Sequence, residues 1–325
     1  MKVSENALNV LAAMSYRGVG RAWIVKNIRG RESANRIVAL LNGRSKVDSV
    51  VTLSNFDIVR ERIGDSIAKL IGFLDGVVAI GDDEFPIIRG NVKNSEQPVA
   101  LFYRGDLSLL SKQNINIAVV GLLTPDEDTE VVEKELVSKL VEHGATIVSG
   151  LARGCDTVAH KQALCSGGKT VAILPSPLNE ILPSANKDLA EEIVRKGGLL
   201  ITEYYEKSKS SMELSGRYQE RDRLQALFSD CVILVASYDK NDSGLDSGSR
   251  LAMEYAASCS IPRAVIYDPE RNAGNPMYDL NRRLIREQVG LVVINRQNMD
   301  RIVSEIVCRR SQQYAKSVVQ SKLFD

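Results

Sequence analysis

Hydrophobic and polar positions divide this chain into a helical part and a part in which strands alternate with helices. Over residues 1–75 the apolar positions recur three and four residues apart, as in amphipathic helices. They include Leu8, Leu11 and Ala12, and further on Ile37, Val38, Leu40 and Leu41. No alternating strand pattern occurs there, so we predict a small helical domain over 1–75.

Short apolar runs that are typical of buried strands dominate residues 76–295. Two runs, at 77–80 and 99–103, flank a polar stretch that contains proline. Seven more alternate with amphipathic helices, at 117–120, 146–149, 170–174, 199–202, 232–236, 264–267 and 291–294. This alternation predicts an α/β fold of the extended Rossmann-like type, a doubly wound and mostly parallel sheet covered on both faces. Residues 296–325 are predicted to form a C-terminal helical tail.

Composition narrows the class of protein. The 325 residues suggest about two domains. Lys and Arg number 42 and Asp and Glu 41, so binding to nucleic acid would depend on a local basic patch. Five cysteines without a C-x-x-C pair and two histidines favour reduced thiols and no metal site. No apolar run approaches the ~18 residues of a membrane span, so we expect a cytoplasmic protein with no membrane contact.

In a doubly wound sheet the ligand-binding loops follow the carboxyl ends of the strands. The loop after the run 146–149 is Gly150-Leu151-Ala152-Arg153-Gly154. Glycines let a ligand approach the backbone, the next helix start can hold an anion, and Arg153 adds a cation. We therefore predict that Gly150, Arg153 and Gly154 bind a phosphate. Asp156 and His160 lie four residues apart and could hydrogen-bond as structural support; a capping Asp156 and a packed His160 are the alternative.

Three other loops at the same edge offer candidate anion-binding residues. Gly121-Leu122-Leu123 lacks two glycines of the dinucleotide fingerprint, so no NAD or FAD cofactor is expected, and a structural turn is the alternative. Lys187, after the predicted helix cap Asn186, could contact a phosphate, unless the preceding loop is only a rigid crossover. Ser243 and Gly244 lie in a polar, glycine-containing stretch that can form a further anion cradle.

Arg221 and Arg223 form a second kind of candidate, because we predict a helix over 219–228 that places them near its start. Positive charge is unfavourable at that end of the helix macrodipole, which suggests an anionic ligand. Ion pairing with Glu220 or Asp222 is the alternative interpretation. Because the two arginines are two positions apart, only one of them can face a given ligand.

Two weaker patterns also suggest nucleic acid. Tyr204 and Tyr205 followed by lysines could stack bases, although a solvated loop explains them equally well. The turn Arg17-Gly18-Val19-Gly20-Arg21 could bind duplex phosphates through its amides, and a simple interhelical turn is the alternative. The chain has no P-loop motif and no nucleophile elbow, so we do not expect an enzyme.

Residues 149–160 resemble the S-G-L-A-R-G-x-D-x-x-A-H signature of the DNA-processing protein A (DprA/Smf) family. Arg221-Asp222-Arg223 is similar to the family's R-N-R element, and Ser243-Gly244 to its S-G-S element. The resemblance covers about 76–294, and the helical segment resembles a sterile-alpha-motif-like domain. It implies a homodimer that binds single-stranded DNA cooperatively, without catalysis, and loads a RecA-type recombinase during uptake of transforming DNA. The implied DNA pocket contains Gly121, Gly150, Arg153, Gly154, Arg221, Arg223, Ser243 and Gly244.

This chain departs from the family pattern at two of those elements. Leu122-Leu123 stands where the family has Ser-Arg, and Asp222 stands where it has asparagine. These differences suggest a divergent member, so a protein of phage defence or of a toxin–antitoxin pair, with a cognate toxin as partner, is an alternative function. A nucleotide sensor or phosphoribohydrolase is another, although residues 243–249 fit the P-G-G-x-G-T-x-x-E loop of such enzymes poorly.

Overall fold

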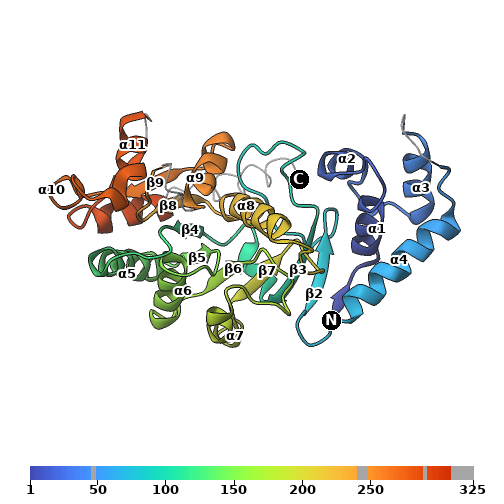
Figure 1. Cartoon of the computed structure of the whole chain (residues 1–325), viewed down its shortest axis with the longest axis horizontal. Helices are drawn as coiled ribbons and strands as arrows, with labels where there is room; N and C mark the ends of the chain where they lie inside the picture. Colours follow the sequence, from blue (N-terminus) through green and yellow to red (C-terminus); the bar gives the residue numbers. More distant parts are fainter. Residues whose placement is uncertain (45–48, 240–247, 288–290, 309–325) are drawn as a thin grey trace, which may run out of the picture.

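A single mixed sheet organises the molecule (Figure 1). The computed structural model describes residues 1–44, 49–239, 248–287 and 291–308. Within them the strand order is β1-β2-β3-β7-β6-β5-β4-β8-β9-β10. The strands are β1 Lys2–Val3, β2 Gly76–Ala79, β3 Ala100–Gly105, β4 Asn116–Val120, β5 Thr146–Ser149, β6 Thr170–Ile173, β7 Leu199–Thr202, β8 Cys231–Leu234, β9 Arg263–Ile266 and β10 Val292–Ile294.

The strands from β7 to β10 in this order are all parallel, and only β3 runs antiparallel to its two neighbours. The chain adds strands to one side of β4 and then, from β8 onward, to the other side. The carboxyl ends of β4 and β8 therefore flank the topological switch point, where ligands of doubly wound proteins bind. The predicted fold class is confirmed.

Helices cover both faces of this sheet (Figure 1). Buried residues of α5 Glu127–Glu142, α6 Cys155–Cys165 and α7 Lys187–Arg195 pack on one face. Those of α8 Ser211–Leu227, α9 Ser249–Ser258 and α11 Asp279–Glu287 pack on the other. The short α10 Pro269–Asn272 and a helix over 299–308 complete the C-terminal side. The remainder of the predicted tail, 309–325, lies outside the described residues.

The N-terminal part is helical, as predicted. It contains α1 Glu5–Met14, α2 Arg21–Asn27, α3 Ala34–Asn42 and α4 Leu53–Ala68. The expectation that it holds no strand is wrong, because β1 pairs with β2 in parallel. A strand of two residues is too short to show an alternating pattern. The helices also share one hydrophobic cluster with the sheet, in which Phe56 of α4 and Phe102 of β3 both take part.

The prediction of a helix over 219–228 is wrong at its start, because α8 begins at Ser211. The Ser210 side chain accepts a hydrogen bond from the Glu213 amide and so caps the helix at that point. Gly216 lies inside the helix, exposed to solvent, and does not interrupt it. None of the helices in the described part of the chain is long and apolar enough to cross a membrane.

Candidate nucleic-acid interface

The loop between β5 and α6 has an unusual backbone. Leu151 is buried with φ +60°, in the left-handed region that non-glycine residues rarely occupy, and Gly154 has φ +68°. The Asp156 carboxylate accepts hydrogen bonds from the amides of Gly150 and Ala152, at 3.2 and 3.1 Å. The first turn of α6 thus fixes the loop that precedes it. Strain of this kind is commonly found at functional sites.

Asp156 and His160, which could have hydrogen-bonded to each other, do not do so in the structure. The His160 ring is fully buried, and its Nδ1 lies 2.7 Å from the Thr170 hydroxyl instead. Burial, reinforced by the charge of Arg221, lowers the pKa of His160 to about 3. His160 is therefore a neutral, packed residue, which agrees with the alternative interpretation.

The glycines of this edge face other parts of the protein. A Cβ on Gly150 would lie 1.5 Å from Nη1 of Arg221, and one on Gly121 would lie 2.5 Å from Sγ of Cys155. A Cβ on Gly154 would lie 2.2 Å from the Leu122 carbonyl oxygen. In the structure, then, these positions allow the loops after β4 and β5 to pack against each other and against Arg221.

Arg221 lies between two buried carboxyl groups. Its side chain is only 6% exposed, and Nη1 is 3.6 Å from Asp156 and 3.3 Å from Asp222. Burial raises the pKa of Asp222 to about 7, although the Arg221 charge acts in the opposite direction. Gln225 donates a hydrogen bond to the same carboxyl group at 3.0 Å. The ion pair expected as the alternative is therefore present at Arg221.

Arg223 is equally internal but faces a different set of groups. Its side chain has no exposed surface, and its guanidinium pairs with Glu203 at the end of β7 and with Glu220. Arg21 of α2 pairs with the same two carboxylates, at 3.5 and 2.6 Å. This network joins α2 to α8 and β7. The pairing with Glu220 agrees with the alternative interpretation, whereas the parts of Arg21 and Glu203 were not predicted.

Arg221 and Arg223 do not lie near a helix start, contrary to the prediction. Both Arg221 and Arg223 lie in the last two turns of α8, because the helix starts at Ser211. The macrodipole acts mainly on charges in the first and last turns of a helix, so it does not disfavour cations at this position. Their position therefore needs no external anion, and what remains of the prediction is that they face different groups.

Two cations at this edge are exposed. Arg153 lies in the loop after β5, Lys187 is the first residue of α7, and neither pairs with a carboxylate of the described residues. Asn186, which is buried, donates hydrogen bonds to the carbonyls of Leu151 and Ala152, at 2.8 and 3.1 Å. The residue before Lys187 is thus bonded to the residue before Arg153. These bonds join two loops that are distant in the sequence, so no local pattern indicates them. The sequence predicted Asn186 only as a helix cap.

The remaining candidates are either occupied or undescribed. The Arg217 guanidinium covers the Tyr204 ring at 4.2 Å from its centroid, and Tyr205 packs against Phe102. Both tyrosine rings are half-buried, so these contacts use part of their stacking surface. Ser243 and Gly244 lie outside the described residues.

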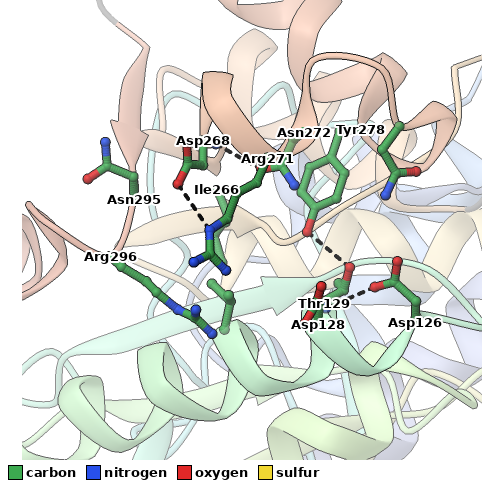
Figure 2. A pocket seen from close by; sticks show the side chains of 12 residues that line it. Asp126, Asp128, Thr129, Ile266, Asp268, Arg271, Asn272, Tyr278, Asn295 and Arg296 are labelled. Carbon is green, nitrogen blue, oxygen red and sulfur yellow. Dashed lines mark hydrogen bonds and ion pairs between the residues drawn. The ribbon is translucent and has the colours of Figure 1, made fainter.

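A pocket of about 260 Å³ lies at the carboxyl ends of β9 and β10, beside the start of α5 (Figure 2). Its polar lining includes Asp126, Asp128, Asp268, Arg271 and Arg296. Because three carboxylates face two guanidinium groups, a DNA backbone would meet net negative charge there. The described residues contain no cluster of three or more His, Cys, Asp or Glu placed to bind a metal ion.

Comparison with known proteins places this geometry in a family. The sequence profile of the DNA recombination-mediator protein A family matches residues 76–306. The chain belongs to that family. It is 34% identical over 179 residues to DNA processing protein DprA of Streptococcus pneumoniae, covering 55% of this chain and 58% of that protein. It is 31% identical over 199 residues to Protein Smf of Escherichia coli, covering 61% and 49%. These matches span about half the length of each relative.

Solved structures of the recombination-mediator family share the fold. DNA processing protein A of S. pneumoniae superimposes with a TM-score of 0.65 and 24% identity over 90% of this chain and 95% of that one. The same protein from Helicobacter pylori, whose structure concerns its single-stranded-DNA binding mode, gives 0.56 and 24% over 72% and 96%. At this identity the likeness establishes the architecture.

Proposed function

We propose that this chain binds single-stranded DNA, without catalysing a reaction, through the phosphate backbone at the carboxyl edge of its sheet. The observation that carries the proposal is the pair of exposed cations, Arg153 and Lys187, which Asn186 connects. Family membership and the binding described for the H. pylori relative agree with it. We further propose that the protein acts as a homodimer that delivers the strand to a RecA-type recombinase.

The proposed contacts are made by side chains more than by backbone amides. Asp156 already accepts hydrogen bonds from the Gly150 and Ala152 amides, so these N–H groups are engaged inside the protein. Gly121, Gly150, Gly154, Arg221 and Arg223 then contribute by allowing close packing or by holding the loop and α8 in place. Contacts of cations with phosphates carry no sequence information, so binding is expected to be strongly salt-dependent and sequence-independent.

Fluorescence anisotropy with a ~30-nucleotide single strand tests the proposal. The double variant Arg153→Gln/Lys187→Gln removes two cations, so the slope of log K against log salt should become shallower by about 1.4, at about 0.7 per phosphate contact. The matched control is Arg195→Gln/Lys196→Gln, which removes two exposed cations from the other end of α7. Absence of wild-type binding at low salt, or equal slopes for both double variants, would refute the proposal.

A further inference from the structure

Positive charge is concentrated in one segment of the N-terminal part of the chain. Residues 17–44 contain seven arginines and lysines and a single acid, Glu32, whereas the whole chain has a formal charge of only +1. The segment therefore carries +6, and the rest of the chain is net negative. It comprises the turn after α1, α2 and α3.

Three arginines of this segment are held by contacts within the protein. Arg21 pairs with Glu203 and Glu220, and Arg31 pairs with Asp83 at 2.7 Å. The Arg44 guanidinium donates to the Arg17 carbonyl at 2.8 Å, which ties the end of α3 to the turn before α2. These contacts hold the two helices in place.

Three other cations lie at the end of α2 and the start of α3. Lys26, Arg29 and Arg36 are exposed and pair with no carboxylate in the described part of the chain. The nearby Glu32 carboxylate accepts hydrogen bonds from the backbone amides of Arg29 and Gly30, at 3.0 and 3.3 Å, so it neutralises none of their side chains. We call Lys26, Arg29 and Arg36 the N-terminal basic surface.

We propose that the N-terminal basic surface is a second binding site for the DNA phosphodiester backbone, separate from Arg153 and Lys187. A segment that carries +6 in an otherwise near-neutral protein creates a local positive potential that attracts a polyanion. Through Arg21, α2 is fastened to the end of β7, which neighbours β6 in the sheet (Figure 1). Both proposed sites therefore lie on elements that are joined to the same sheet. Single-stranded and duplex DNA both carry the phosphodiester backbone that this surface would bind.

Trp23 makes this surface observable. It is the only tryptophan of the chain, it lies in α2 three residues before Lys26, and it is half-buried against the N-terminal core. Its emission therefore reports on binding at α2, whereas the anisotropy of a labelled oligonucleotide reports on binding anywhere on the protein.

The test titrates the full chain with a 30-nucleotide single strand and, separately, with the same sequence as a duplex. We expect at least one of these two forms of DNA to cause a saturable change in Trp23 emission, which about 1 M salt should reverse. The form of DNA that causes the change is the form that this surface binds. Lys26→Gln/Arg29→Gln/Arg36→Gln should abolish that change. For a single strand it should also make the salt slope shallower by about 2, at about 0.7 per contact. The control Lys93→Gln/Lys112→Gln/Lys196→Gln removes three exposed lysines elsewhere and should alter neither.

The two measurements distinguish failure of the second site from failure of the site proposed at the carboxyl edge. Arg153→Gln/Lys187→Gln should lower the affinity seen by anisotropy yet leave the Trp23 response in place at higher DNA concentration. An unchanged Trp23 signal with both forms of DNA would overturn the second site, even where the oligonucleotide binds. The second site would also be overturned if Lys26→Gln/Arg29→Gln/Arg36→Gln gave the same Trp23 response and the same salt slope as the control variant.

Discussion

At the scale of single residues, the glycines of the carboxyl edge are required by the protein's own side chains. Gly150 is the clearest case, because Nη1 of Arg221 occupies the space that a methyl group would need. From this position Nη1 of Arg221 lies 3.6 Å from Asp156 and 3.3 Å from Asp222. A glycine that resembles a ligand-binding position therefore also serves a buried ion pair.

Gly150→Ala should destabilise the protein. The new methyl group would force Arg221 away from two buried carboxyl groups, and breaking such a pair costs about 3–5 kcal/mol. Chemical denaturation measures the loss. Gly216→Ala is the matched control, since no atom lies within 4 Å of the added Cβ and the site is inside α8. That change should stabilise by roughly 0.5–1 kcal/mol. Equal stability of Gly150→Ala and wild type would contradict the packing described.

Asp222→Asn should change how stability depends on pH. The folded pKa of about 7 exceeds the ordinary 3.8, so the folded state keeps this proton to higher pH than the unfolded chain does. The free energy of unfolding therefore falls as pH rises from about 4 to about 7, by on the order of 4 kcal/mol at 1.36 kcal/mol per pKa unit. The amide does not titrate, so the variant should lack this decrease.

Urea unfolding at pH 5 and pH 8 checks this expectation. The difference between the two pH values should be smaller for Asp222→Asn than for the wild type, with the variant relatively more stable at pH 8. Asp128→Asn, at an exposed carboxylate in the first turn of α5, serves as the control and should keep the wild-type pH dependence. The same pH dependence in both variants would contradict the raised pKa of Asp222.

At the scale of elements, Asn186 connects the loop after β5 to the start of α7. Asn186→Ala removes the two carbonyl hydrogen bonds and a third, to the Thr157 hydroxyl, at 2.8 Å. Arg153 and Lys187 would then have to be ordered on binding, at roughly 0.5–1.5 kcal/mol for each side chain. We expect about tenfold weaker binding of a single strand by anisotropy. Asn114→Ala, which removes one exposed hydrogen bond near η1 (Leu107–Leu110), should leave the affinity unchanged.

The elements could be predicted from the sequence wherever a local pattern defines them. The runs 146–149 and 199–202 coincide with β5 and β7, because continuous apolar residues mark strands buried on both faces. The start of α8 was missed because 211–218 show no amphipathic stripe: Met212 is exposed, and Arg217 is the one buried residue of this stretch. The capping interaction at Ser210 defines that helix end instead.

The sequence indicates where the proposed site lies, but it does not define the contacts within it. The glycine-rich loop with Arg153 was identified because its residues are consecutive. Whether Arg221 pairs with Asp156 or with a ligand depends on where α8 crosses the loop, and residues 65 positions apart leave no local signal. The same holds for Arg21 and Glu203, which meet only because the helical segment packs beside β7.

At the scale of the whole molecule, the helical segment and the sheet are packed into one core. A single hydrophobic cluster includes Leu11 and Phe56 of the helices, Phe102 of β3 and Leu174 after β6. Pairing of β1 with β2 and the ion pairs of Arg21 add polar links. The sequence suggested a boundary near residue 75 because the pattern changes there. A change of pattern does not require a separate core.

This shared core predicts that the chain unfolds as one cooperative unit. Trp23 emission follows the N-terminal helices alone, whereas far-UV circular dichroism follows all helices and strands. The two urea transitions should coincide, as two-state behaviour requires. Phe56→Ala, in α4, should lower both midpoints together, since truncating a fully buried phenylalanine costs about 3–5 kcal/mol. An independent domain over 1–75 would instead give a Trp23 transition at a different urea concentration, and Phe56→Ala would shift only that one.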